Sequence, residues 1–359
     1  MRMTTAMTGL LLMAAASSAH ADGSWTAGER HGTTTVASAA VRDAAQRDAL
    51  RYTVWYPAPA SSRETALTIG PPDAPLFDVG RSAKDAPVAG DRLPTLLLSH
   101  GNGGSARMMG WLGTALAREG YLVIAVDHPG NNGADEMTLT GSMLSWLRAD
   151  DLRTALAAVK ADPNLGPHVD AGRLGVVGFS AGGYTALLAA GARPDLQRLL
   201  AFCRAHPDDG VCQPQQEAAT HTMEARLAAA SSPALAPWIA EADRSRAIPG
   251  VRAVFLLAPA IVQAFAPEQL SSLQQPVSIL LGDADKVAPP ASNGDAAQAV
   301  IPGATLTRLP DVGHYDFLSE CTAPGRQRLA ALCSTAVPKA QTHAQAIDAT
   351  ERFFGDALR

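Results

Sequence analysis

The sequence predicts an α/β protein with a mostly parallel, doubly wound sheet and an inserted lid. Two observations carry this prediction. Apolar runs without polar alternation, such as TLLL and LVIAV, are typical of strands buried on both faces of a parallel sheet. These runs alternate along the chain with helix-like segments, as in successive βαβ units. A chain of 359 residues, 47% of them hydrophobic, is long enough to bury such a core.

The elements are expected in a simple order. Residues 33–56 carry two runs typical of the antiparallel strands that open a mixed sheet, and residues 57–93 are expected to form a long connection. Further on, the patterns predict buried strands at 93–101, 121–130, 173–180, 251–259, 276–285 and 304–314, and helices at 105–120, 141–162, 181–192 and 340–357.

Residues 193–249 interrupt this alternation with several prolines and Ala-rich helical pieces. In an open α/β sheet, an insertion at this point rises above the carboxyl ends of the strands, where ligands bind. We predict that it is a lid on the main domain. The alternative is a solvated surface insertion without a role.

The N-terminus has the pattern of a secretory signal peptide. Arg2 precedes a short apolar run from Met7 to Ala16, and the sequence 19–21 is a small-x-small cleavage site. We therefore predict a signal peptide over 1–21, one domain over 22–359, and a periplasmic or secreted protein. The apolar run is too short to span a bilayer, and a buried N-terminal helix is the alternative.

Cysteines and charge narrow the class further. Three disulfide connectivities are open to four cysteines; the simplest closes two short loops, Cys203 with Cys212 and Cys321 with Cys333, and free buried thiols are the alternative. The spacing lacks C-x-x-C, so no zinc site is expected. With a net charge of −5 and no basic run, we expect no nucleic-acid partner. No later apolar run is long enough for a membrane span, and we expect a monomer that acts on a small-molecule ester.

The stretch GFSAG (178–182) places Ser180 between a predicted buried strand and a predicted helix. Such a turn is sharp, and glycines two residues before and after the serine leave room for it. The pattern alone arises easily in a chain with 31 glycines, but this context is that of a nucleophile elbow.

A serine nucleophile needs a base and an acid, in the order Ser, Asp or Glu, His. His314 follows the last predicted strand, whereas His343 lies inside a predicted helix with poor reach. Asp285, in the turn GDADKVAPP, is the predicted acid, with Asp283 as the alternative. Asp311 and Asp316 are expected to be loop residues.

The oxyanion hole should combine two backbone N–H groups. Ala181 follows the nucleophile, and Asn102 lies in the Gly-rich loop SHGNGG, with Gly103 as its alternative. His100 in the same loop is expected to be structural.

The motifs HGNGG, VDHPGNN, GFSAGGYTALLAAGAR, GDADKVAPP and GHYDFLSEC together resemble bacterial exported proteins described as predicted dienelactone hydrolases. These are related to the platelet-activating-factor acetylhydrolase group of α/β-hydrolases, which implies the α/β-hydrolase fold. True dienelactone hydrolases use a cysteine where this chain has Ser180. The vertebrate acetylhydrolases carry their acid one strand earlier, where this chain has Ala258 and Ala260, so the acid here is Asp285.

The expected function is hydrolysis of a carboxylic ester through Ser180, Asp285 and His314 and an acyl-enzyme, without metal or cofactor. An amidase or peptidase using the same triad is the first alternative, and an exported binding protein with a hydrolase fold is the second. Trp111 and five apolar lid residues are candidates for an acyl pocket or for simple packing: Leu199, Leu200, Phe202, Leu227 and Trp238.

Overall fold

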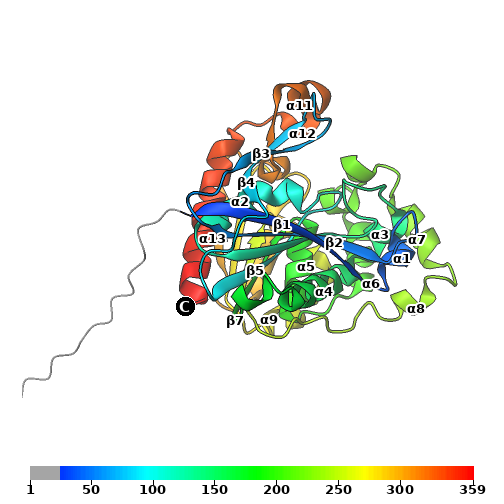
Figure 1. The fold of residues 1–359 in the computed structure, drawn as a ribbon. Helices are drawn as coiled ribbons and strands as arrows, with labels where there is room; N and C mark the ends of the chain where they lie inside the picture. The colour runs from blue at the N-terminus through cyan, green and yellow to red at the C-terminus, as the bar shows by residue number, and fades with distance from the viewer. Residues whose placement is uncertain (1–24) are drawn as a thin grey trace, which may run out of the picture.

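The structure, a computed structural model, describes residues 25–359, so the predicted signal peptide and its cleavage after Ala21 lie outside the described residues. A mixed sheet of 11 strands crosses the molecule in the order β10-β9-β8-β7-β5-β6-β2-β1-β4-β11, with β3 paired to β4 (Figure 1). Its strands are β1 (Thr26–Thr35), β2 (Ala49–Ala58), β3 (Thr65–Ile69), β4 (Phe77–Lys84), β5 (Leu93–Ser99), β6 (Leu122–Asp127), β7 (Val169–Phe179), β8 (Val251–Leu257), β9 (Val277–Gly282), β10 (Thr305–Leu309) and β11 (Glu320–Cys321).

Along the chain, most helices follow strands of the parallel half. The helices are α1 (Ala39–Arg42), α2 (Gly110–Arg118), α3 (Leu139–Met143), α4 (Arg148–Ala161), α5 (Ala181–Ala190), α6 (Leu196–Ala205), α7 (Met223–Ala230), α8 (Ala236–Ile239), α9 (Pro267–Ser271), α10 (Gly294–Val300), α11 (Ala323–Arg328), α12 (Ala330–Cys333) and α13 (Lys339–Ala357). Within the described residues, no helix is both long and apolar enough to cross a membrane.

The parallel half of the sheet is the one that the sequence predicts. β5 pairs in parallel with β6 and β7, and β8, β9 and β10 follow outward from β7. The two N-terminal strands are antiparallel, because β2 pairs antiparallel with both β1 and β6. The fold class is therefore confirmed as α/β with a mostly parallel sheet wound on both faces.

Residues 57–93 differ from the prediction of a long connection, which was wrong. They contain the antiparallel hairpin β3–β4, and β4 joins the sheet beside β1. The β4 sequence FDVGRSAK buries Phe77 and Val79 on alternate positions, but its few apolar residues make this period-two pattern weak. Figure 1 shows the hairpin beside α11 and α12, at the upper edge of the molecule.

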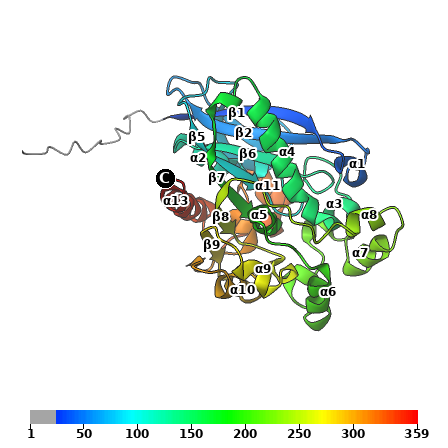
Figure 2. The ribbon, with the colours of Figure 1, turned by 90° about the horizontal axis from the view of Figure 1, so that it is seen from below.

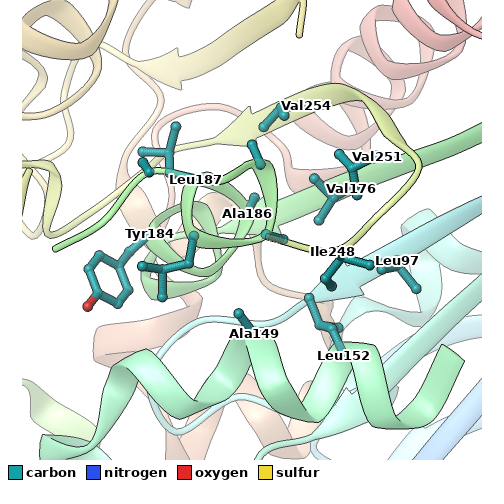
Figure 3. Packing of buried hydrophobic residues seen from close by; sticks show 14 of the residues in the cluster. Leu97, Ala149, Leu152, Val176, Tyr184, Ala186, Leu187, Ile248, Val251 and Val254 are labelled. Carbon is teal, nitrogen blue, oxygen red and sulfur yellow. The ribbon is translucent and has the colours of Figure 1, made fainter. Parts of the chain in front are cut away.

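Helices cover both faces of the sheet. Within β5, Leu96 and Leu98 belong to the core under α2 and α13, whereas Leu97 belongs to the core on the opposite face under α4 and α5. Successive strand residues point to opposite faces, so a continuous apolar run fills both cores. Figure 2 shows the two helical layers from below, and Figure 3 shows α5, with Tyr184, Ala186 and Leu187, between α4 and the strands.

Residues 193–249, here called the insertion, connect α5 to β8 and carry α6, α7 and α8. They form the outer part of the molecule beyond α3 and α5 (Figure 2). A disulfide joins Cys203 to Cys212 inside the insertion, and a second joins Cys321 to Cys333 near the C-terminus. This is the sequential pairing, and it leaves no free cysteine in the described part of the chain.

Candidate active site

Ser180 lies at the sharp turn between β7 and α5, with φ of 55° and ψ of −120°. A positive φ is strained for a residue with a side chain, and the surrounding contacts must maintain it. Its N–H donates to the carbonyl of Leu257 at 3.0 Å. A Cβ on residue 178 would lie 1.9 Å from the Gly182 carbonyl oxygen, and one on residue 182 would lie 2.0 Å from that of Ser99. Only glycine therefore fits at positions 178 and 182, two residues before and two residues after Ser180.

His314 joins Ser180 to Asp285. Its Nδ1 lies 2.6 Å from Oδ2 of Asp285, and its Nε2 lies 2.8 Å from Oγ of Ser180. A carboxylate only accepts hydrogen bonds, so we assign the imidazole proton to Nδ1. Nε2 then accepts the hydrogen bond from the Ser180 hydroxyl, which is the arrangement a general base requires.

The Asp285 carboxylate is itself fixed by the turn after β9. Its Oδ1 accepts hydrogen bonds from the backbone N–H groups of Val287 and Ala288 at 2.9 and 2.8 Å. Oδ2 is thereby directed at His314, which comes from the loop after β10. The structure thus brings the three predicted residues together from three separate loops at the carboxyl ends of strands.

The other acidic and histidine residues that the sequence offered for the triad make other contacts. Asp283 accepts a hydrogen bond from the N–H of Asp311 at 2.7 Å and belongs to the turn. Asp316 accepts one from the N–H of Gly313 at 2.8 Å. His343 lies in α13, where it stacks on Trp111, and neither side chain is part of the cavity described below.

Ser99, His128 and Asp151 form a second Ser-His-Asp arrangement in the protein interior. The imidazole of His128 is 2.9 Å from Oγ of Ser99 through Nε2 and 2.9 Å from Asp151 through Nδ1. All three side chains are fully buried, and none lines the cavity. Hydrogen-bond geometry alone therefore does not show which serine can meet a substrate. Ser180 lines the cavity and Ser99 does not, so only Ser180 is accessible. Ser99 is the first residue of the Gly-rich loop SHGNGG, so this group supports that loop.

Ser180 opens into a cavity of about 330 Å³, whose wall also contains the predicted oxyanion residues Asn102 and Ala181. Within residues 25–359, no backbone or side-chain acceptor meets the N–H of either residue. The first N–H groups of a helix have no intrahelical acceptor, which explains the free N–H of Ala181. Two unpaired N–H groups beside Ser180 are suited to an oxyanion.

The hairpin, the C-terminal segment and the insertion all add residues to the cavity wall around the triad loops. The hairpin supplies Ile69, Leu76 and Phe77, the C-terminal segment supplies Leu318 and Leu332, and the insertion supplies Val211, Cys212, Gln213, Gln215, Glu217, His221, Met223 and Arg226. The five apolar residues of the insertion that sequence analysis named as candidates for an acyl pocket do not line it. Leu199 and Trp238 instead pack against the core, and Leu227 is 39% exposed.

Sequence reasoning missed several polar residues of the cavity wall, among them Asn131, Arg148, Glu217 and Tyr315. Asn131 donates from its side-chain amide to Oδ1 of Asn102 at 2.7 Å and accepts from the Arg148 guanidinium at 2.6 Å. Glu217 accepts from the Asn102 side chain at 3.0 Å and from the Tyr315 hydroxyl at 3.3 Å. Asn131 lies shortly after a parallel strand, where ligands bind in such sheets, so its position could have identified it as a site residue. Glu217 lies in the insertion, and no sequence pattern there indicates a place at the cavity.

Burial shapes the charges around the Gly-rich loop. Arg148 is buried and donates to neutral acceptors, among them the carbonyl of His100, and burial lowers its pKa to about 9. Burial also lowers the pKa of His100 well below its ordinary value, with the Arg148 charge contributing. His100 is therefore neutral, and its Nε2 accepts a hydrogen bond from the His128 N–H at 3.3 Å. This agrees with the structural role expected from the sequence.

A family model described as the alpha/beta hydrolase family matches residues 96–326, more than half of the chain. The chain belongs to the alpha/beta hydrolase family. The match contains Ser180, Asp285 and His314. The resemblance seen in the sequence motifs is thereby confirmed at the level of the family.

Two known proteins are similar to this alpha/beta hydrolase, one in its structure and one in part of its sequence. The structure of a ferulic acid esterase from Streptomyces cinnamoneus superposes with a TM-score of 0.63 over 95% of this chain and 92% of that chain, at 22% identity. At this identity the similarity concerns the fold. A bis(hydroxyethyl) terephthalate hydrolase of Streptomyces coelicolor (strain ATCC BAA-471 / A3(2) / M145) is 39% identical over 87 residues, 24% of this chain. The match spans 25% of that relative's length.

Proposed function

We propose that this alpha/beta hydrolase is an exported serine hydrolase of carboxylic esters, with Ser180, His314 and Asp285 as its catalytic triad. The observation that carries the proposal is the continuous hydrogen-bond path from Ser180 Oγ through His314 to Asp285, with distances of 2.8 and 2.6 Å, at the wall of a cavity. A hydroxyl in contact with an oriented base is the requirement for nucleophilic catalysis by serine.

The chemistry follows from the positions of these atoms. Oγ of Ser180 attacks the ester carbonyl while Nε2 of His314 takes the hydroxyl proton, and the Asp285 carboxylate stabilises the imidazolium that forms. The N–H groups of Asn102 and Ala181 stabilise the negative charge on the carbonyl oxygen of the tetrahedral intermediate. His314 then gives its proton to the leaving alcohol, and the acyl group remains on Ser180. Water repeats the two steps, releasing the carboxylic acid.

Export is the second part of the proposal. Two disulfides are typical of proteins outside the reducing cytoplasm, and they accompany the signal-peptide pattern at 1–21. We place the protein in the periplasm or outside the cell, as a monomer acting on small esters. The insertion supplies much of the cavity wall, which supports its role as a lid.

The direct test uses the Ser180→Ala variant of the protein without residues 1–21. Turnover of a p-nitrophenyl ester should fall by roughly 10⁴- to 10⁶-fold, because the nucleophile is lost, while the melting temperature stays close to that of the parent. A matched p-nitroanilide, run in parallel, separates ester from amide hydrolysis.

A fluorophosphonate probe gives an independent readout with a control inside the chain. After proteolysis, the mass of the probe should appear on the peptide that contains Ser180. The peptide that contains Ser99 should stay unmodified, although Ser99 has the same hydrogen-bond geometry toward His128. Turnover by Ser180→Ala near the parent rate, or labelling at Ser99 instead, would refute the proposal.

A further inference from the structure

Arg226 is a charged side chain at the cavity wall that the reaction above does not use. It comes from α7 in the insertion, and its Nε donates to the carbonyl of His221 at 3.1 Å. Its terminal nitrogens, Nη1 and Nη2, have no hydrogen-bond acceptor among residues 25–359. Neither atom is fully buried, so both keep some accessible surface, and Arg226 is one of the residues that line the cavity.

Other buried guanidinium groups of the described chain have acceptors for their terminal nitrogens: Arg148 donates to Asn131 and to the His100 carbonyl, and two others pair with carboxylates. Arg42 pairs with Asp151 at 2.7 Å, and Arg246 pairs with Asp150 at 3.1 Å. No carboxylate of residues 25–359 forms such a pair with Arg226, and burial lowers the pKa of its guanidinium without a carboxylate to oppose this shift. Arg226 is partly buried, so its charge loses part of its hydration, and an anion beside it would offset that loss. The free guanidinium therefore lacks an anion.

The remaining cavity wall does not supply that anion. Both carboxylate oxygens of Glu217 already accept hydrogen bonds, one from Asn102 and the other from Tyr315. Much of the rest of the wall is apolar: Ile69, Leu76, Phe77, Met108, Leu318 and Leu332. A molecule that fills the cavity thus meets apolar side chains, polar groups such as Ser180 and His221, and Arg226, whose terminal nitrogens have no acceptor in the described chain.

We propose that Arg226 binds a carboxylate of the substrate, so that the natural substrate is an ester carrying a second, ionised carboxyl group. The planar guanidinium fork matches a carboxylate with two parallel N–H···O bonds. This inference rests on the proposed ester hydrolysis and names the substrate class for that site.

The test compares esters that differ only in this charge. Mono-p-nitrophenyl glutarate carries the carboxylate on the acyl side, and its terminal amide is the neutral match. Para-acetoxybenzoate carries it on the alcohol side, and para-acetoxybenzamide is its neutral match. The parent protein should show the higher kcat/KM for the charged member of one pair, and that pair identifies the side of the ester that faces Arg226.

Three variants assign the preference to Arg226. In Arg226→Gln, kcat/KM for the charged ester should fall about 10- to 100-fold, the loss expected for hydrogen bonds to a charged group, while the neutral ester stays within about twofold. Arg226→Lys keeps the charge without the fork and should give an intermediate preference. Arg204→Gln removes an equal charge from an exposed position of the insertion and should leave the preference unchanged.

A binding measurement separates this inference from the proposed function. Calorimetry with Ser180→Ala should detect at least one of the two charged esters, mono-p-nitrophenyl glutarate or para-acetoxybenzoate, and the further substitution Arg226→Gln should remove that binding. Equal kcat/KM within both ester pairs, or an equal loss of charged and neutral turnover in Arg226→Gln, would overturn the Arg226 inference while leaving ester hydrolysis intact. If no ester is cleaved and Ser180 is not labelled, ester hydrolysis fails, and calorimetry alone decides the role of Arg226.

Discussion

The imidazole of His343 stacks on the indole of Trp111, with ring centroids 3.9 Å apart and planes inclined by 7°. The contact joins α13 to α2 on one face of the sheet. Each ring also donates a hydrogen bond to the backbone that follows His314: His343 Nε2 to the carbonyl of Leu318 at 3.0 Å, and Trp111 Nε1 to that of Phe317 at 3.2 Å. The pair therefore anchors the segment that carries His314.

This contact predicts a pH dependence of stability. Burial lowers the pKa of His343 from 6.5 to about 4. As the pH falls below 6.5, the unfolded chain binds a proton at this position before the folded chain does, so stability present above pH 6.5 is lost down to about pH 4. Urea unfolding should show a loss of about 3 kcal/mol from this group.

In the variant His343→Gln, the free energy of unfolding should be lower at pH 7, because the stacking is lost, but its decline toward pH 4 should be shallower. His206→Gln, at an exposed histidine, should follow the parent curve. An unchanged decline in His343→Gln would contradict the assignment of this proton to His343.

The contact between Asp285 and His314 predicts a loss of rate without a loss of fold. Asp285→Asn preserves the size of the side chain but removes the charge that stabilises the imidazolium, so kcat should fall by roughly 10³- to 10⁴-fold. Asp283→Asn is the matched control two residues away; an amide oxygen can still accept the hydrogen bond from Asp311, and activity should remain within a few fold. A similar loss in both variants would point to damage to the turn.

The parallel half of the fold was predictable because its strands are buried on both faces. Runs such as TLLL leave no polar face, and each is followed by a helix. The hairpin β3–β4 was not predictable in the same way. It lies at the edge of the sheet with few buried apolar positions, and Phe77 and Val79 stand among polar residues. Its pairing with β1 depends on tertiary contacts that a local pattern does not contain.

The candidate triad was predictable because each member follows a strand of the parallel half, where the carboxyl ends converge. The cavity-lining residues of the insertion were not predictable, because the insertion does not follow the strand–helix alternation that fixes positions in the parallel half. Trp238 and Leu199 were reasonable candidates by hydrophobicity, yet they pack against the core, and Glu217 and Arg226 face the cavity instead. Which side of a short insertion helix faces a cavity depends on loop geometry.

The contact between Gly182 and Ser99 predicts that the elbow tolerates no added methyl group. In Gly182→Ala the new Cβ would lie 2.0 Å from the Ser99 carbonyl oxygen, so the turn must shift. We expect a loss of at least about 2 kcal/mol in unfolding free energy, or no soluble protein, as for an overpacked core. Gly355→Ala is the control: it lies in α13 with nothing within 4 Å of its Cβ, and it should gain roughly 0.5–1 kcal/mol. Equal stability of the two variants would contradict this account.

Asn131 is predicted to position the oxyanion loop without touching the substrate's reacting atoms. It links the buried Arg148 to the side chain of Asn102, whose N–H lacks a protein acceptor in the described structure. In Asn131→Ala the loop loses this hold, and kcat should fall about tenfold, because an oxyanion donor acts mainly in the transition state, while KM changes little. Asn132→Ala is the matched control, since Asn132 donates to the carbonyl of His128 and does not contact Asn102. Rescue by Asn131→Asp, which keeps the acceptor for Arg148 but not the donor to Asn102, should be partial. A change in KM alone, or equal losses at both positions, would assign Asn131 to substrate binding or to general loop stability.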